Sequence, residues 1–148
     1  IDLDKERAFG SVIPSFMQQE TFWKTYTFKT EESYLNDYKK SLFGLTCKKG
    51  GWDCLRHYEI LSTGCVPLFV DIKYCPKDTL TTLPKDMLLE AFRLIDYNET
   101  TSNLSVPTNF NEGHYEMLAN SLLEYTKKKL TTESSAKYLL DTTKQIFS

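Results

Sequence analysis

The segment between Gly64 and Asp71 constrains the fold more than any other part of the chain. Residues 65–70 form a nearly continuous apolar run, and Gly64 stands directly before it. A short run without alternating polar positions is typical of a strand buried on both faces, as in parallel sheets. Pro67 favours an early or edge position, because proline cannot donate to the hydrogen-bond ladder of a sheet. The run therefore predicts a strand of a parallel sheet.

The chain before this run predicts a strand, a helix and a second strand. Residues 1–25 are expected to be irregular, and Thr25–Phe28 reads as a short strand because it alternates β-branched and aromatic residues. Thr30 is a suitable N-cap for a helix, because its hydroxyl can accept a hydrogen bond from a free N–H group. The acidic residues in the next turn also favour a helix start. Gly44 is expected to end that helix, and residues 43–47 to form a short second strand. The apolar stripe of the helix consists of Tyr34, Leu35, Tyr38 and Leu42.

A second helix is expected between residues 52 and 63, directly before the apolar run. Gly64 is suited to end it, because glycine readily adopts the left-handed conformation that follows many helices. Asp53 is placed to act as its N-cap. The inner stripe of this helix is predicted to consist of Cys54, Leu55, Tyr58 and Leu61.

The chain after the run predicts further helices. A helix begins at Pro84, the polar residues 96–109 form an exposed connection, and amphipathic helices follow at 111–129 and 132–147. The alternation of strands and helices predicts an α/β fold, a Rossmann-like small parallel sheet flanked by helices, with C-terminal helices. We expect residues 1–110 to form the α/β domain and residues 111–148 a helical extension packed on it.

The composition excludes several classes of protein. A net charge of -2 without a basic block argues against nucleic-acid binding and against a membrane-surface role. The sequence contains no run of about 18 apolar residues, so no transmembrane helix is predicted. The first residues lack the apolar core of a signal peptide. The four cysteines are expected to be free thiols in a reducing compartment, which favours a cytoplasmic location.

A glycine loop and the helix after it form the candidate site. Gly50 and Gly51 let a backbone approach a ligand closely, and the following helix start offers free N–H groups. Lys48 and Lys49 add positive charge, which suits a diphosphate. The other candidate site residues, on the helix and the next strand, are Arg56, Glu59 and, more weakly, Asp71. Arg56 suits phosphate oxygens and Glu59 suits ribose hydroxyls.

Simpler interpretations stay open at this point. Arg56 and Glu59 also suit a surface ion pair, and Asp53 in the first turn would oppose an anion. His57 is interpreted as a structural residue rather than a general base. The spacing of the cysteines predicts no zinc site. Three aromatic residues suit either a sugar-stacking surface or the core: Trp23, Tyr26 and Trp52.

The residues from Lys48 to Phe69 resemble the signature of exostosin-like glycosyltransferases, most closely a group known from large DNA viruses and microbes. The signature has an Arg and then a Glu on a helix, followed by Gly-Cys-x-Pro at the start of a strand. Arg56, Glu59 and residues 64–67 match these positions. The resemblance spans roughly residues 26–95, including Cys75-Pro76. Pro67 stands where many retaining relatives carry a second Glu.

The resemblance implies one half of a two-Rossmann-domain glycosyltransferase, the half that binds a nucleoside-diphosphate sugar. It implies that Arg56 and Glu59 contact the donor, that the acceptor is a glycan or protein, and that no catalytic metal or other cofactor is needed. A second Rossmann domain or another chain would complete the enzyme, and no catalytic residue is assigned. Two alternatives are a catalytically silent nucleotide- or glycan-binding or scaffold module, and an interaction protein that uses residues 111–148.

Overall fold

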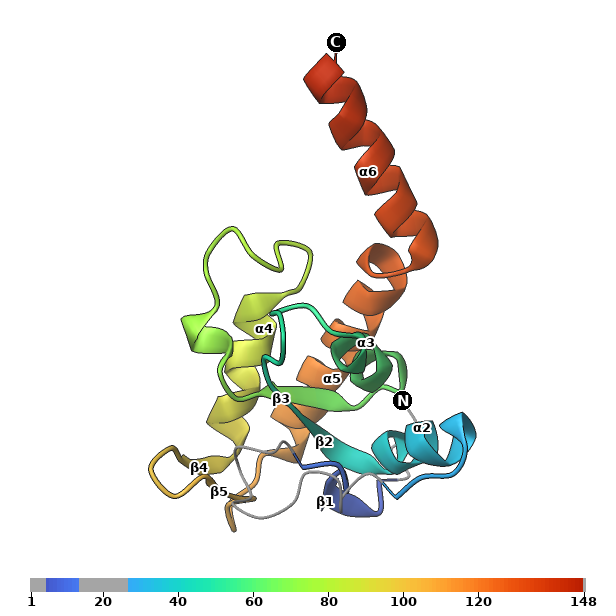
Figure 1. Cartoon of the computed structure of the whole chain (residues 1–148). Coiled ribbons are helices and arrows are strands. Elements are labelled where there is room, and N and C mark those ends of the chain that lie inside the picture. The colour runs from blue at the N-terminus through green and yellow to red at the C-terminus, as the bar shows by residue number, and fades with distance from the viewer. Residues whose placement is uncertain (1–4, 14–26, 148) are drawn as a thin grey trace.

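The parallel sheet predicted from the apolar run forms the centre of the protein (Figure 1). The computed structural model describes residues 5–13 and 27–147. Within them, three parallel strands pair in the order β1 (Arg7–Phe9), β2 (Ser41–Thr46) and β3 (Val66–Phe69). The Rossmann-like α/β architecture is confirmed, and Pro67 lies in an edge strand of the described sheet.

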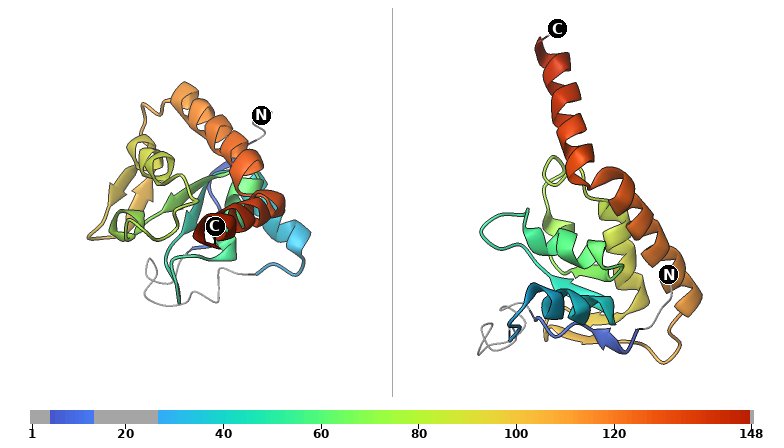
Figure 2. Two further views of the ribbon diagram at one scale, coloured as in Figure 1. Left: turned by 90° about the horizontal axis from the view of Figure 1, so that it is seen from above. Right: turned by 90° about the vertical axis from the view of Figure 1, so that its right-hand side faces the viewer.

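Helices cover both faces of the sheet (Figure 2). They are α2 (Glu31–Lys39), α3 (Leu55–Ser62), α4 (Lys85–Glu90) with the 3-10 turn η3 (Ala91–Leu94), and α5 (Glu112–Lys129). Gly44 faces α3, and the Phe43 ring contacts Tyr115 of α5 with 5.3 Å between centroids. Because successive residues of a strand point to opposite faces, α3 and α5 cover different sides. We call these sides the α3 face and the α5 face.

Gly44 lies in the middle of β2 and not at the end of a helix. A Cβ atom at this position would lie 2.8 Å from Ile60 Cγ2, closer than real contacts allow. The strand therefore needs glycine so that α3 can approach it. The prediction that α2 continues to Leu42 was also wrong, since α2 ends at Lys39 and β2 begins at Ser41.

The helix caps are confirmed in part. The Thr30 hydroxyl accepts a hydrogen bond from the Ser33 N–H as the N-cap of α2, and Gly64 follows α3 with φ 70°. However, α3 begins at Leu55 with Cys54 as its N-cap, so the prediction that Asp53 caps it was wrong. The predicted inner stripe of α3 was wrong at Leu55, which is 71% exposed. The residues that α3 buries are His57, Ile60 and Leu61.

Three short strands were not predicted. β1 lies within the stretch expected to be irregular, and β4 (Asp96–Asn98) pairs with β5 (Asn103–Ser105) as an antiparallel hairpin where an exposed connection was expected. The first two residues of the predicted strand Thr25–Phe28 lie outside the described residues, and its last two residues are not in a strand. The alternation of strand and helix is present, but it begins at β1.

A buried carboxylate joins the end of β1 to α2. Asp37 is 5% exposed and accepts hydrogen bonds from Arg7 Nη1, the Ser11 N–H and the Ser11 hydroxyl, each at 2.7 Å. A Cβ atom on Gly10 would lie 3.2 Å from both Asp37 Oδ2 and the Tyr38 ring. Asp37 therefore fixes the loop that follows β1 against α2.

The two C-terminal helices lie in different surroundings. α5 begins after the N-cap Asn111 and contributes Tyr115, Leu118, Ala119 and Leu122 to the core. α6 (Thr132–Phe147) projects away from the sheet (Figure 2), and its Leu139, Leu140 and Ile146 are exposed. The division of the chain at residue 110 stays a prediction. In the described part of the chain, no helix has the length and apolar character needed to cross a membrane.

Candidate functional site

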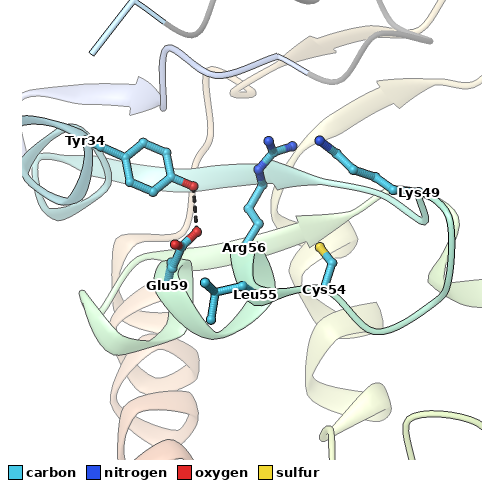
Figure 3. Close-up of a pocket in the computed structure, with 6 residues that line it drawn as sticks. All are labelled: Tyr34, Lys49, Cys54, Leu55, Arg56 and Glu59. Atoms are coloured by element: carbon cyan, nitrogen blue, oxygen red, sulfur yellow. Dashed lines mark hydrogen bonds between the residues drawn. The ribbon is translucent and has the colours of Figure 1, made fainter. Parts of the chain in front are cut away.

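A pocket of about 260 Å³ lies beside α2 and the first turns of α3 (Figure 3). It is found near the carboxyl end of β2, where ligands bind in open α/β sheets. Its walls come from α2, from the loop between β2 and α3, and from α3 itself. The lining residues are Tyr34, Lys49, Cys54, Leu55, Arg56 and Glu59. Three of the predicted site residues, Lys49, Arg56 and Glu59, therefore share one pocket.

Arg56 and Glu59 lie side by side on α3, as their spacing of three residues predicts. Both side chains are half-buried, and the Nε and Nη1 atoms of Arg56 are shielded from solvent. The Glu59 carboxylate accepts a hydrogen bond from the Tyr34 hydroxyl at 2.8 Å. Arg56 and Glu59 are thus less exposed than a surface ion pair would be, and Glu59 has Tyr34 as a partner.

Tyr34 is a site residue that the sequence reasoning assigned to the core. Its ring is buried against Tyr38 and Phe28, but its hydroxyl reaches across to Glu59 on α3. Burial raises the pKa of Tyr34 to about 12; the hydrogen bond to Glu59 also raises it, whereas Arg56 acts in the opposite direction. The hydroxyl therefore stays protonated at neutral pH and holds Glu59 as a donor. The helical spacing of Tyr34 with Leu35, Tyr38 and Leu42 indicates a buried stripe, and it does not show that the Tyr34 hydroxyl has a polar partner.

Lys49 and Arg56 bring two positive charges to the pocket. Burial lowers the pKa of the Lys49 amino group, and the nearby Arg56 guanidinium lowers it further. Like charges at close range disfavour the charged form of a lysine. An anion between the two groups would remove that repulsion. The pocket therefore has positively charged side chains on the side of Lys49, while Glu59 supplies a hydrogen-bond acceptor on the other side (Figure 3).

The other predicted site residues lie outside the pocket lining. Lys48 Nζ sits 5.0 Å from the centroid of the Trp52 ring, and the Lys48 N–H donates to both oxygens of Asp71 at 3.1 Å. Asp71 thus fixes the start of the loop rather than lining the pocket. Among the described residues, a Cβ atom at Gly50 would meet nothing within 4 Å, and at Gly51 only a backbone oxygen at 4.0 Å. The packing of this part of the chain therefore does not require these glycines.

His57 is buried and has partners that fix its place in the fold, as predicted for a structural residue. It is 1% exposed, and its ring stacks on Phe69 with 4.3 Å between centroids. Nε2 lies 2.9 Å from the Trp52 carbonyl oxygen, which can only accept, so Nε2 carries the proton. Nδ1 then accepts from the Thr46 hydroxyl at 2.9 Å. The imidazole thereby holds the β2–α3 loop against the sheet.

Among the residues that the structure describes, the cysteines and the candidate stacking residues do not add to the pocket beyond Cys54. Cys47, Cys54, Cys65 and Cys75 are free thiols, as predicted. Trp52 is half-buried, with its ring 6.2 Å from that of Phe69, so it belongs partly to the core. The other two candidates for a stacking surface, Trp23 and Tyr26, lie outside the described residues. Within residues 5–13 and 27–147, no three His, Cys, Asp or Glu side chains are gathered as a metal site.

Comparison of the chain with protein-family models, with curated proteins and with solved structures found no significant match. The resemblance to exostosin-like transferases therefore depends on the residues of the signature alone.

Proposed function

We propose that the pocket binds a nucleoside-diphosphate sugar and that the chain is the donor-binding half of a glycosyltransferase. The observation that carries this proposal is the convergence of Lys49, Arg56 and Glu59 on one pocket near the carboxyl end of a parallel sheet. Cations and a carboxylate held together suit a ligand that carries both phosphates and hydroxyl groups. The match of Arg56 and Glu59 to the exostosin-like signature supports the same assignment.

The charges suggest a role for each residue. Lys49 and Arg56 would hold oxygens of the diphosphate, Arg56 through its planar pair of N–H groups. Glu59 would accept hydrogen bonds from ribose or sugar hydroxyls, and Tyr34 would fix the carboxylate for that task. At about 260 Å³ the pocket is smaller than typical sites for whole cofactors, so it suits part of such a donor.

A second candidate is a catalytically silent module that binds a nucleotide or glycan. One observation favours it. His57, the nearest histidine to the pocket, is buried and held by Thr46 and Trp52. His57 does not line the pocket, so an enzyme would take its catalytic base for sugar transfer from elsewhere, from a second Rossmann domain or another chain. A glycan or protein acceptor would bind mainly there.

Isothermal titration with nucleotides and nucleoside-diphosphate sugars tests the proposal. We expect one nucleotide series to bind the wild-type chain, and Arg56→Ala to lower that affinity roughly 10- to 100-fold, since a hydrogen bond to a charged group contributes about 1.5–3 kcal/mol. Arg93→Ala is the matched control, because Arg93 is 76% exposed and pairs with Glu90 away from the pocket.

Glu59→Gln provides a second arm, with exposed Glu124→Gln as its control. Loss of affinity at Glu59 but not at Glu124 supports the assigned role. Binding of the donor without hydrolysis or transfer to any acceptor would favour the silent module. A folded wild-type chain that binds no member of the panel would refute the donor site.

A further inference from the structure

One pair of side chains beside the pocket has no part in the proposed donor site. Cys54 Sγ lies 3.9 Å from His57 Nδ1, at the N-cap position of α3. The His57 ring is oriented by the residue two positions before Cys54, since the Trp52 carbonyl accepts from His57 Nε2. The pair therefore has the arrangement of a thiol beside a base whose orientation is fixed by a third group.

The imidazole is poised to receive a proton on the side that faces Cys54. Since Nε2 donates to the Trp52 carbonyl, the lone pair of the neutral ring is on Nδ1, toward Thr46 and Cys54. The Thr46 hydroxyl, which donates to Nδ1 in this state, can rotate when Nδ1 gains a proton. The imidazolium so formed would stabilise a Cys54 thiolate through a charge-assisted hydrogen bond.

Cys54 differs from the two buried cysteines in both access and acidity. Burial raises the pKa of Cys47 to about 11 and that of Cys65 to about 12. Burial also acts to raise the pKa of Cys54, but the hydrogen bond and charge of His57, together with the backbone N–H groups of Arg56 and His57, outweigh it, and the pKa falls below its ordinary value. Reactive cysteines lie in such partly exposed, electropositive surroundings.

The Cys54 sulfur is also accessible from the pocket. Cys54 is a lining residue, and Figure 3 shows its sulfur on the same side as the Lys49 and Arg56 side chains. A group attached to this sulfur would occupy space next to both cations.

We propose that Cys54, paired with His57, is a modification site that exchanges with small-molecule disulfides to form a mixed disulfide in the pocket wall. This reaction stands apart from the proposed function. Only its consequence, exclusion of a nucleotide sugar from the pocket, depends on that function.

The exchange is balanced as follows. The Cys54 proton passes to His57 Nδ1, and the thiolate attacks one sulfur of the small disulfide. A bond forms between Cys54 Sγ and that sulfur while the original S–S bond breaks. The other half leaves as a thiolate, which takes up the proton from the imidazolium. The Cys54 sulfur is oxidised and the departing sulfur is reduced, so the disulfide is the oxidant.

The test uses bis(2-hydroxyethyl) disulfide, a neutral probe, with peptide mapping by mass spectrometry to follow each cysteine at pH 7. We expect Cys54 in the native chain to react at least about a hundredfold faster than Cys47, because a pKa near 11 leaves about a hundredfold less thiolate than an ordinary cysteine has. Cys54 should also react faster in the native chain than in the same chain unfolded in urea, because its pKa is lowered only in the native structure.

His57→Gln should remove most of the native advantage of Cys54. Since His57 is buried, the comparison of native and urea-unfolded wild-type protein tests the proposal even if this variant does not fold. Cys54 reacting no faster in the native than in the unfolded chain would overturn the proposal. So would a native chain in which Cys47 or Cys65 is modified first.

A last arm separates this site from the proposed function. Inorganic pyrophosphate, present during the reaction, should slow modification of Cys54 if it binds between Lys49 and Arg56. Fast modification without protection would support the thiol site and count against the diphosphate site. Slow modification of a chain that does bind pyrophosphate would do the reverse.

Discussion

The two faces of the sheet are held by different kinds of contact. On the α5 face, Phe43 and Leu68 pack into an apolar core with Tyr115 and Leu122 of α5. On the α3 face, polar side chains are buried with partners, as in the contact between Thr46 and His57, and Gly44 allows a close approach of α3. The pocket lies on this second side.

The difference indicates a division of roles between the faces. The α5 face depends mainly on volume and hydrophobic character, although the Tyr115 hydroxyl also donates to the Leu42 carbonyl oxygen. The α3 face depends on particular partners, because a buried polar group that loses its hydrogen bond costs about 1–3 kcal/mol. A site that must position charged side chains benefits from this second kind of contact. Substitutions on the two faces should therefore differ in size and in what rescues them.

The largest effect is expected on the α5 face. Phe43→Ala removes a fully buried ring that contacts Tyr115 and Phe110, and should lower the free energy of unfolding by about 3–5 kcal/mol. Urea unfolding followed by circular dichroism measures this loss. Leu140→Ala, on the exposed stripe of α6, should change stability by less than about 0.5 kcal/mol. Equal losses in both variants would show that α6 is covered in solution.

A smaller effect is expected where α3 approaches β2. Gly44→Ala places a methyl group against Ile60 and should cost about 1–3 kcal/mol through overpacking. Ile60→Ala removes the clashing atoms, so the double variant should be more stable than the sum of the two single losses predicts. Strict additivity in this double-mutant cycle would contradict the close approach.

The buried carboxylate of α2 should contribute through its partners rather than its volume. Asp37→Asn keeps the shape but weakens the hydrogen bonds from Arg7 and Ser11, and should cost about 1–2 kcal/mol. The cost is limited because the Arg7 side chain is 40% exposed and can be hydrated. Glu6→Gln breaks an exposed ion pair with Lys40 and should change stability by less than about 0.5 kcal/mol. Equal losses of stability in Asp37→Asn and Glu6→Gln would contradict a stabilising role for the hydrogen bonds of Asp37.

The smallest effect is an alkaline loss of stability on the α3 face. Burial raises the pKa of Cys65 from 9.0 to about 12, so between these values the unfolded chain binds fewer protons than the native chain. Stability present below pH 9 should therefore fall as the pH rises toward 12. By pH 10 the wild type should lose about 1 kcal/mol more than Cys65→Ala, relative to their difference at pH 7. A difference that is the same at both pH values would contradict the shift.

Local signals in the sequence predicted the elements whose ends or faces are fixed nearby. Thr30 caps α2, Gly64 ends α3, and the apolar run forms β3 because each depends on residues within one or two turns. β1 was missed because its three residues show no alternation and pair with Ser41 and Phe43, far along the chain. The buried side of α3 was misassigned because His57 is satisfied by Thr46, a partner on another element.

The site was predictable to a similar degree. Lys49, Arg56 and Glu59 lie within one loop and one helix, so their convergence follows from local spacing. Tyr34 joins Glu59 from 25 residues away, and Asp71 binds the Lys48 backbone from 23 residues away. Such contacts depend on how the strands are ordered, which the sequence pattern did not specify.

The projection of α6 has a mechanical consequence. With a rise of about 1.5 Å per residue, its 16 residues extend about 24 Å from the junction with α5. The helix therefore has the geometry of a lever with its fulcrum near Leu130. A change of about 10° in the angle there would carry the far end through about 4 Å, several times the shift near the fulcrum. Small adjustments at the end of α5 would thus be amplified at Ile146.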